Sequence, residues 1–362
     1  MLYSPEFLNQ LPAAGPHETS ALLNLNTHRP RALHTVNRWF DELYPNGNAD
    51  LASRLRGNAT SQFVPALYEL LIHRYFSARG WAVRRDYRID GGNPDFYIPD
   101  IDWPIEVTAL GESENEHAEN GVLDDVCRSL EKVKSDFWIS IFGFHFKRIP
   151  IDTRKVVLWV EQQLEEHETG QEFEAAYVFD DGESHIDFVF GRKGMNARGN
   201  VGAKGMYTYD FELSKARILA RLRSKARKYG RDMLIFLCTG AGFWSIRAES
   251  LDECLYGEYL VSFNRETSQR RDQRCPNGFF SKLVQGVPRN TRVAAVVACE
   301  RRIVDETNDE IGLSLTVYHN PYARRRLDVG VFSEVRQFAL VLEDDRSVTL
   351  GWVTPKTEPV KL

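Results

Sequence analysis

The sequence predicts an α/β protein of the α+β kind that contains both antiparallel and parallel strand pairs. Three short runs rich in β-branched and aromatic residues, 81–89, 95–98 and 105–110, are separated by turn residues and predict an antiparallel meander. Residues 212–229 have helical spacing and lead into the continuous apolar run 233–239. A helix followed by a fully apolar strand is typical of a crossover to a buried parallel strand.

The remaining elements follow from the same two periodicities. Apolar residues at helical spacing predict helices over 30–43 and 63–79. Further helices are predicted over 123–133, 153–167 and 251–260, strands over 137–146, 292–304, 313–319 and 337–342, a hairpin over 175–190 and a loop over 111–120. The resulting domain plan is an N-terminal helical segment 1–58, a core of 59–110 and 211–345, an insertion 111–210 and a C-terminal tail 346–362.

Length and composition bound the class of protein. The chain has 362 residues and 43% hydrophobic and 27% charged residues, which excludes a wholly disordered, collagen-like or coiled-coil chain. Apolar runs such as 293–299 are far shorter than the roughly 20 residues that span a bilayer, and no secretory signal follows Met1. The five cysteines form no C-x-x-C pair, which favours a reducing compartment. We expect a soluble, cytoplasmic protein with no membrane partner.

Charge is unevenly distributed along the chain. The net charge of −5, from 46 basic and 51 acidic residues, argues against a protein that coats nucleic acid through bulk charge. Acidic side chains nevertheless crowd 112–125, and basic side chains crowd 215–231. The local distribution therefore bears on binding partners more than the net charge does.

Two carboxylates on neighbouring predicted strands are the sharpest chemical signal. Asp95 follows a proline at the start of one strand, and Glu106 lies in the next. Because side chains on a strand alternate between faces, Glu106 and Thr108 share one face while Ile105 and Val107 point to the core. Pairing of the two strands would bring Asp95 close to Glu106.

Glu69 is a third candidate carboxylate, on the predicted helix 63–79, where Ala66 and Ile72 leave it poorly solvated. Like charges this close require a compensating cation, and hard oxygen ligands suit Mg²⁺ or Mn²⁺. The alternative is that the three carboxylates are unrelated surface or turn residues.

The order of these features resembles the PD-(D/E)XK, or restriction-endonuclease-like, nuclease superfamily, including its bacterial members. The matching order is a helix with Glu69, a strand, Pro94-Asp95, a strand with Glu106-x-Thr108, and a later cationic helix before a buried strand. The resemblance covers 60–110 closely and 210–240 loosely. It implies a mixed central sheet flanked by helices, here with a large insertion and a C-terminal extension. It also implies phosphodiester hydrolysis with one or two divalent ions and Asp95 and Glu106 as metal ligands. Glu69 matches the family's helical glutamate, which implies a third metal-site residue that orients a ligand or a second ion.

The sequence departs from the family at Thr108, where a lysine is usual. That lysine supplies positive charge near the attacking water and the phosphate, which a hydroxyl cannot do. Some members carry the lysine on a neighbouring helix, so Lys225 or Lys228 could fill the role. The other reading is that the catalytic apparatus has decayed.

The predicted helix 212–229 carries a basic stripe at intervals of four, four and three residues, made by Arg217, Arg221, Lys225 and Lys228. Arg271 and Arg274 precede a turn with Phe279 and Phe280 that could stack on bases. Such cations bind phosphates in nucleic-acid proteins. The alternatives are a solvated helix face and a charged loop before two core phenylalanines.

We therefore expect a metal-dependent endonuclease that uses Mg²⁺ or Mn²⁺ and acts on DNA in preference to RNA, in bacterial defence or DNA maintenance. The rival hypothesis is a catalytically degenerate module of the same fold that binds nucleic acid or a partner protein. The oligomeric state is open, and a homo-oligomer is among the options.

Overall fold

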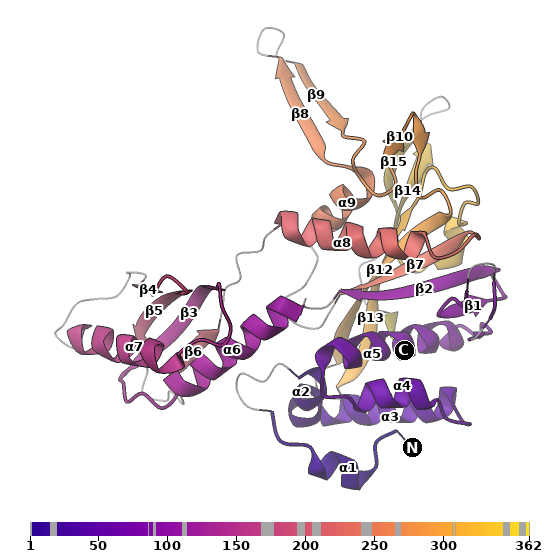
Figure 1. Ribbon diagram of the computed structural model, residues 1–362. Helices are drawn as coiled ribbons and strands as arrows, with labels where there is room; N and C mark the ends of the chain where they lie inside the picture. The colour runs from indigo at the N-terminus through magenta and orange to yellow at the C-terminus, as the bar shows by residue number, and fades with distance from the viewer. Residues whose placement is uncertain are drawn as a thin grey trace. The chain divides into compact units, whose positions relative to one another are not determined.

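The computed structural model describes residues 2–14, 20–85, 87–89, 92–110, 114–167, 177–193, 200–204, 211–239, 248–264, 269–305, 307, 309–342, 348–354 and 360–361. The chain divides into two compact units (Figure 1). The larger unit comprises Met1–Ala13, Ser20–Gly111 and Asp210–Leu362. The smaller unit comprises Ala14–Thr19 and Glu112–Tyr209, a range close to the insertion in the domain plan.

The larger unit begins with helices that belong to its core. They are α1 (Pro5–Gln10), α2 (Ala21–His28), α3 (Pro30–Leu43), α4 (Ala49–Arg56) and α5 (Thr60–Ala78). Ser4, Ser20 and Asn48 cap α1, α2 and α4 by accepting hydrogen bonds from backbone N–H groups in the first turn. The apolar stripe of α3 packs into the same hydrophobic cluster as α5. The N-terminal segment is therefore part of the core unit.

A mixed sheet forms the centre of this unit, in the order β1-β2-β7-β12-β13-β14-β15 with β16 beside β13. Its strands are β1 (Phe96–Ile98), β2 (Trp103–Leu110), β7 (Met233–Thr239), β12 (Val293–Asp305), β13 (Glu310–His319), β14 (Arg336–Leu342), β15 (Val348–Thr354) and β16 (Val360–Lys361). β1 and β2 pair antiparallel, whereas β2, β7 and β12 run parallel. The expected α/β class with both kinds of strand pair is confirmed.

Helices cover both faces of the sheet. Along the fully buried β7, Leu234 and Phe236 join the cluster that contains α3 and α5, whereas Ile235 and Leu237 join the cluster that contains α8 (Phe211–Ala226) and α9 (Ala248–Tyr256). Figure 1 shows α5 and α8 on opposite sides of the strands. This alternation at period two explains the continuous apolar run, because both faces of the strand are buried.

Two hairpins and a short 3₁₀ helix complete the larger unit. β8 (Tyr259–Asn264) pairs with β9 (Gln269–Arg274), and β10 (Leu283–Val284) pairs with β11 (Val287–Pro288). The 3₁₀ helix η1 covers Val329–Phe332.

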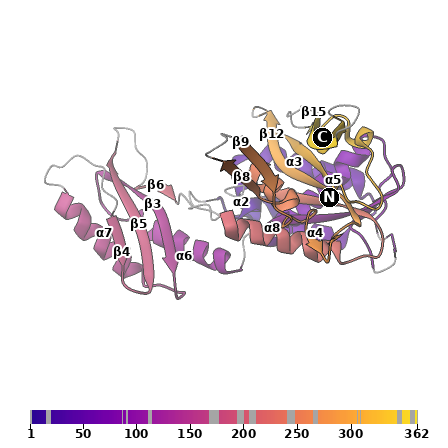
Figure 2. The ribbon, with the colours of Figure 1, turned by 90° about the horizontal axis from the view of Figure 1, so that it is seen from above.

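The smaller unit has its own two-layer core. Its sheet has the order β4-β5-β3-β6, with β3 (Phe137–Phe146), β4 (Tyr177–Asp180), β5 (Ser184–Arg192) and β6 (Val201–Lys204). The helices α6 (Glu114–Leu130) and α7 (Thr153–His167) share a hydrophobic cluster with one face of this sheet (Figure 2).

Three expectations are corrected by the structure. The run 81–89 forms only the isolated bridges Arg84–Tyr97 and Ile89–Gly92 where it is described, because its adjacent arginines leave neither face apolar. The expected loop 111–120 is helical from Glu114 onward, and its first three residues lie outside the described part of the chain. The expected tail 346–362 contributes β15 and β16 to the central sheet.

The helices that the structure describes include none long and apolar enough to cross a membrane.

Candidate active site: a buried cluster of carboxylates and lysines

Glu106 lies at the centre of the site, in the middle of β2. Its neighbour Ile105 pairs with Phe96 of β1, and Glu106 itself pairs with Ile235 of β7. Ile105 and Val107 pack into the cluster that contains α5, so Glu106 projects to the opposite face, toward α8. The exposed fraction of Glu106 is 0%. A carboxylate buried in this way requires strong hydrogen-bond donors.

The donors come from the end of α8 and the turn that follows it. Lys225 Nζ lies 2.5 Å from Oε2 of Glu106, and Lys228 Nζ lies 3.0 Å from Oε1. The hydroxyl of Tyr229 has two acceptors within hydrogen-bond distance for its one proton, Oε1 of Glu106 and the backbone carbonyl of Asn93. Burial, and then the Glu106 carboxylate, raise the pKa of Tyr229 well above its ordinary value, so this hydroxyl remains a donor at neutral pH.

Asp95 is held next to Glu106 by the hairpin of β1 and β2. Its Oδ2 accepts a hydrogen bond of 2.7 Å from the backbone N–H of Val107 and lies 3.7 Å from Lys225 Nζ. Burial and the Glu106 carboxylate raise the pKa of Asp95 above its ordinary value, against the opposing effects of Lys225 and the Val107 N–H. Asp95 is therefore easier to protonate than an ordinary aspartic acid.

Lys225 bridges the two acids. Its ammonium contacts Oδ2 of Asp95 and Oε2 of Glu106, and 24% of its side chain is exposed. Burial lowers the pKa of Lys225, but the two carboxylates outweigh burial and leave that pKa above its ordinary value. The side chain is thus a permanent positive charge between two acids.

The donor chemistry of this pair suits a hard divalent ion. Two carboxylates from adjacent strands lie close together, and the contacts described for Asp95 use only Oδ2. Mg²⁺ is commonly bound by one or two carboxylates that share it with water and substrate phosphates. A divalent ion beside Asp95 would also lower the pKa of this acid, which burial raises. Among the described residues, no group of three or more His, Cys, Asp or Glu side chains is placed to hold a metal.

Glu69 is engaged elsewhere. Its two oxygens accept hydrogen bonds of 2.7 and 2.8 Å from the two terminal nitrogens of Arg54, and Arg85 lies 3.7 Å from Oε2. The charge of Glu69 still contributes to the raised pKa of Asp95. Glu69 therefore affects the site only through the electrostatic effect of its charge on Asp95, because arginine side chains bind its oxygens.

Thr108 lies one step along the same face of β2 as Glu106 and is buried. Its hydroxyl carries no charge, and an ammonium that contacts both acids is supplied by Lys225. Tyr229 is the residue of the cluster that the sequence analysis did not single out. The signal available for it was the run Lys228-Tyr229-Gly230 at the end of a helix whose lysines were already candidates.

The other predicted nucleic-acid contacts are not gathered at this cluster. Arg221 is exposed on α8, and Arg217 is partly buried on the same helix. Arg274 forms an ion pair of 2.6 Å with Asp252 and stacks on Tyr259. Arg271 belongs to β9, but its side chain lies outside the described part of the structure.

The turn after β9 does not offer its two phenylalanines for base stacking. Phe279 and Phe280 are fully buried in the cluster that contains α8 and α9. The alternative reading, core phenylalanines, is therefore confirmed.

Comparison with protein-family models, with curated proteins and with solved structures gave no match to this chain. The interpretation of the cluster therefore rests on its geometry and chemistry.

Proposed function

We propose that this protein is a divalent-metal-dependent nuclease of restriction-endonuclease-like fold. The observation that carries the proposal is the meeting of the partly exposed Asp95 and Lys225 with the buried Glu106. Two acids on adjacent strands and one amine from a distant helix form the set that metal-assisted phosphodiester hydrolysis uses. The positions of α5, the hairpin of β1 and β2, and the parallel β7 beside β2 support the fold assignment.

The mechanism assigns a separate task to each side chain. Asp95 and Glu106 would hold Mg²⁺ or Mn²⁺, which when bound lowers the pKa of water and neutralises charge on the phosphate. Lys225 keeps a positive charge beside the acids, where charge develops on the phosphoryl oxygens. Tyr229 and Lys228 fix the orientation of Glu106 by binding Oε1. Preorganised charges of this kind do most of the work in phosphoryl transfer.

In this proposal Lys225 takes the task for which Thr108 is unsuited. Lys225 contacts both acids, whereas Lys228 contacts Glu106 alone. We therefore assign the catalytic charge to Lys225 and a positioning task to Lys228. Glu69 lowers the local potential without binding the ion, because Arg54 occupies both of its oxygens.

The test is cleavage of plasmid DNA, circular single-stranded DNA and RNA in Mg²⁺, Mn²⁺ or EDTA. Wild-type protein should cleave only with a divalent ion, and DNA in preference to RNA. Asp95→Ala and Glu106→Ala should each lower the rate on the order of 100-fold or more, since each removes a metal ligand. Glu165→Ala, an exposed position on α7, is the matched control and should cleave as wild type does. Cleavage that survives both substitutions, or that persists in EDTA, would refute the proposal.

A second candidate function is a non-catalytic nucleic-acid-binding or protein-binding module. The observation that favours it is the occupancy of Glu106, whose two oxygens already bind Lys225, Lys228 and Tyr229. Retention of DNA without cleavage, at the same affinity in EDTA and in Mg²⁺, would select this candidate.

The five cysteines are free thiols. This supports our proposal that the protein works in a reducing compartment such as the cytoplasm, where defence or DNA maintenance would place a nuclease.

A further inference from the structure

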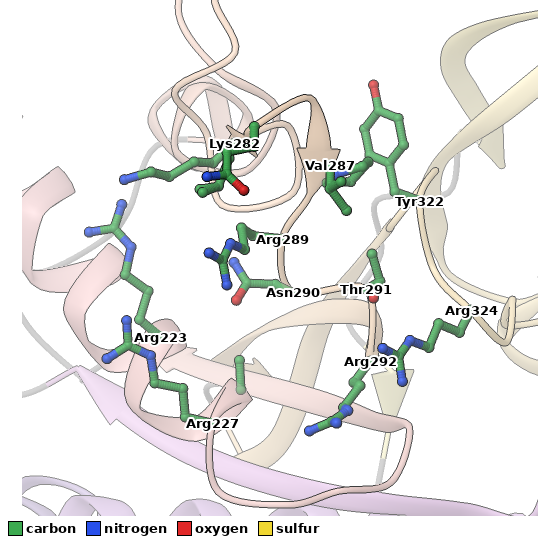
Figure 3. Close-up of a pocket in the computed structure, with 14 residues that line it drawn as sticks. Arg223, Arg227, Lys282, Val287, Arg289, Asn290, Thr291, Arg292, Tyr322 and Arg324 are labelled. Atoms are coloured by element: carbon green, nitrogen blue, oxygen red, sulfur yellow. The ribbon is translucent and has the colours of Figure 1, made fainter.

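A large cationic cavity lies on another side of α8 from the carboxylate cluster. Its volume is about 940 Å³, within the range of about 300 to 1,000 Å³ that ligand sites have. Its walls come from the end of α8, from the hairpin of β10 and β11, and from the turns that precede β12 and follow β13. Figure 3 shows Arg223 and Arg227 on the α8 side, Tyr322 and Arg324 on the opposite side, and Arg289 between them. We name this feature the basic cavity.

The charge of the basic cavity has one sign. Among the described residues, its charged lining consists of Arg223, Arg227, Lys282, Arg289, Arg292 and Arg324, with no acidic residue. The chain as a whole carries a net charge of −5. Like charges gathered in a concave surface repel one another, so the arrangement costs free energy unless an anion neutralises it. The basic cavity is therefore suited to a polyanion.

Acidic side chains of the protein do not neutralise these cations in the part of the chain that the structure describes. Elsewhere in the larger unit, arginines such as Arg54 and Arg274 bind carboxylates. Within the part of the chain that the structure describes, none of the six cations of the cavity forms an ion pair with an acid. Arg227, Arg289 and Arg324 are exposed and point their charges to solvent. Their donors remain available for phosphate oxygens.

The basic cavity also presents apolar and aromatic surface. Tyr322 is 45% exposed and Val287 is 62% exposed, and both line the cavity beside its arginines. A simple phosphate site has no use for an exposed ring, whereas an unpaired base stacks on one. A continuous duplex keeps its base faces stacked inside the helix and cannot offer them to Tyr322. The combination fits a single strand.

The basic cavity adjoins the carboxylate cluster through one residue. Arg292, which lines the cavity, donates a hydrogen bond of 3.2 Å to the backbone carbonyl of Tyr229. The hydroxyl of Tyr229 binds Glu106. A polynucleotide strand held in the cavity would therefore lie next to the residues that flank the cluster.

We propose that the basic cavity binds a short stretch of single-stranded nucleic acid, with its phosphates on the six cations and a base on Tyr322. The assignment of this strand as the substrate of the cluster rests on the proposed nuclease function. Binding of the strand by the basic cavity does not depend on that function. If the protein is a nuclease, such binding identifies its substrate class as nucleic acid with an unpaired segment.

The test measures binding without catalysis. Fluorescein-labelled oligothymidylate, oligouridylate and a blunt DNA duplex are titrated with full-length protein in EDTA, with fluorescence anisotropy as readout. Wild type should bind the single strands at least about 10-fold more tightly than the blunt duplex. The triple variant Arg227→Ala, Arg289→Ala, Arg324→Ala should lose on the order of 100-fold in affinity. The slope of its affinity against salt concentration should fall by about 0.7 for each phosphate that the variant no longer neutralises, the value found for single strands.

Two further variants separate stacking from charge. Tyr322→Ala should lose about 10-fold in affinity for oligothymidylate, in line with one stacked base, but nothing in affinity for inorganic polyphosphate. Arg326→Ala, an exposed cation in the same turn that does not line the cavity, is the matched control and should bind as wild type does. Circular dichroism and a urea unfolding curve verify that the triple variant is folded.

Three results would overturn the inference. They are equal binding by wild type and the folded triple variant, equal binding of single strand and blunt duplex, and unchanged oligothymidylate binding by Tyr322→Ala. The Asp95→Ala variant tests the nuclease assignment separately, because it removes a proposed metal ligand and leaves the basic cavity unchanged. Normal binding without any cleavage by wild type would sink the nuclease and leave the cavity assignment standing. Cleavage with an unchanged affinity in the triple variant would do the reverse.

Discussion

The two sides of α8 and of the turn after it carry the same kind of charge and put it to different use. Lys225 and Lys228 face the strands, where they bind the buried Glu106. Arg223 and Arg227 face the hairpin of β10 and β11, where the described lining contains no acid. The two sides of the helix differ because one faces the strand that carries Glu106 and the other faces the hairpin of β10 and β11. A cationic helix therefore has no single role, and each cation must be judged by the partner across from it.

A second contrast concerns the acids. Glu69 is held by the two-pronged contact of Arg54, whereas Glu106 is held mainly by the amines of two lysines. An arginine fork fits a carboxylate in one fixed geometry. A lysine is a compact point charge on a flexible stem, and it can shift when another cation arrives. This explains why we assign the metal to Asp95 and Glu106 and a field effect to Glu69.

The largest effect that follows from the comparison is on cleavage. Lys225→Ala should lower the single-turnover cleavage rate on the order of 100-fold at saturating protein, because it removes the charge that contacts both acids. Lys228→Ala should lower it less, by about 10-fold, since Lys228 contacts Glu106 alone. The measurement is the rate in Mg²⁺ with a labelled strand. Equal rates for Lys225→Ala and the control Arg326→Ala would break the assignment.

The next effect is on stability. Lys225→Ala should lower the free energy of unfolding by about 2 to 3 kcal/mol, because it removes one partner of a buried charge. This is less than the loss for a fully unpaired acid, since Lys228 and Tyr229 remain. Arg227→Ala, on the cavity side, should change the free energy of unfolding by less than about 0.5 kcal/mol. Urea unfolding measures both, and similar losses in the two variants would show that the two sides do not differ.

A smaller effect isolates the tyrosine. Tyr229→Phe keeps the ring and removes the hydroxyl that binds Oε1 of Glu106. A hydrogen bond to a charged group contributes about 1.5 kcal/mol or more, so the variant should lose about that much free energy of unfolding. No measurable loss would mean that the hydroxyl does not stabilise the Glu106 carboxylate.

The smallest effect is the pH dependence of folding stability that arises from Asp95. Because its pKa is raised in the folded protein, its ionisation opposes folding. The stability that protonated Asp95 provides is full below the ordinary value of 3.8 and is lost as the pH rises through the folded-state pKa. Asp95→Asn should therefore be more stable than wild type at pH 7, with a difference that disappears at low pH. Thermal melts across this range test the sign, and a less stable variant at pH 7 would contradict it.

Elements with an unambiguous period could be predicted from sequence. The helix at 30–43, the strand at 137–146 and the buried strand at 233–239 have the predicted bounds. The hairpin of β10 and β11 could not be predicted, because two-residue strands carry no periodicity. It is this hairpin that forms a wall of the basic cavity, so the cavity could not be predicted either.

Some contacts of the candidate site could likewise be predicted from sequence, and others could not. The predicted pairing of two short strands was enough to predict that Asp95 and Glu106 would lie together. The stripe on the helix included Lys225 and Lys228, but it also included Arg217 and Arg221, which do not reach the cluster. The pairing of Glu69 with Arg54 was beyond sequence reasoning, because it depends on the packing of α4 against α5, and no local pattern encodes that contact.

Single-turnover cleavage of a labelled single strand in Mg²⁺ or Mn²⁺, measured as a function of protein concentration, separates the carboxylate cluster from the basic cavity. Two variants are compared, Lys225→Ala at the carboxylate cluster and Arg289→Ala in the basic cavity. Arg289→Ala should approach the wild-type plateau at higher protein concentration, whereas Lys225→Ala should remain slow at every concentration. Full recovery of Lys225→Ala at high concentration, or the absence of cleavage by wild type with either ion, would contradict this expectation.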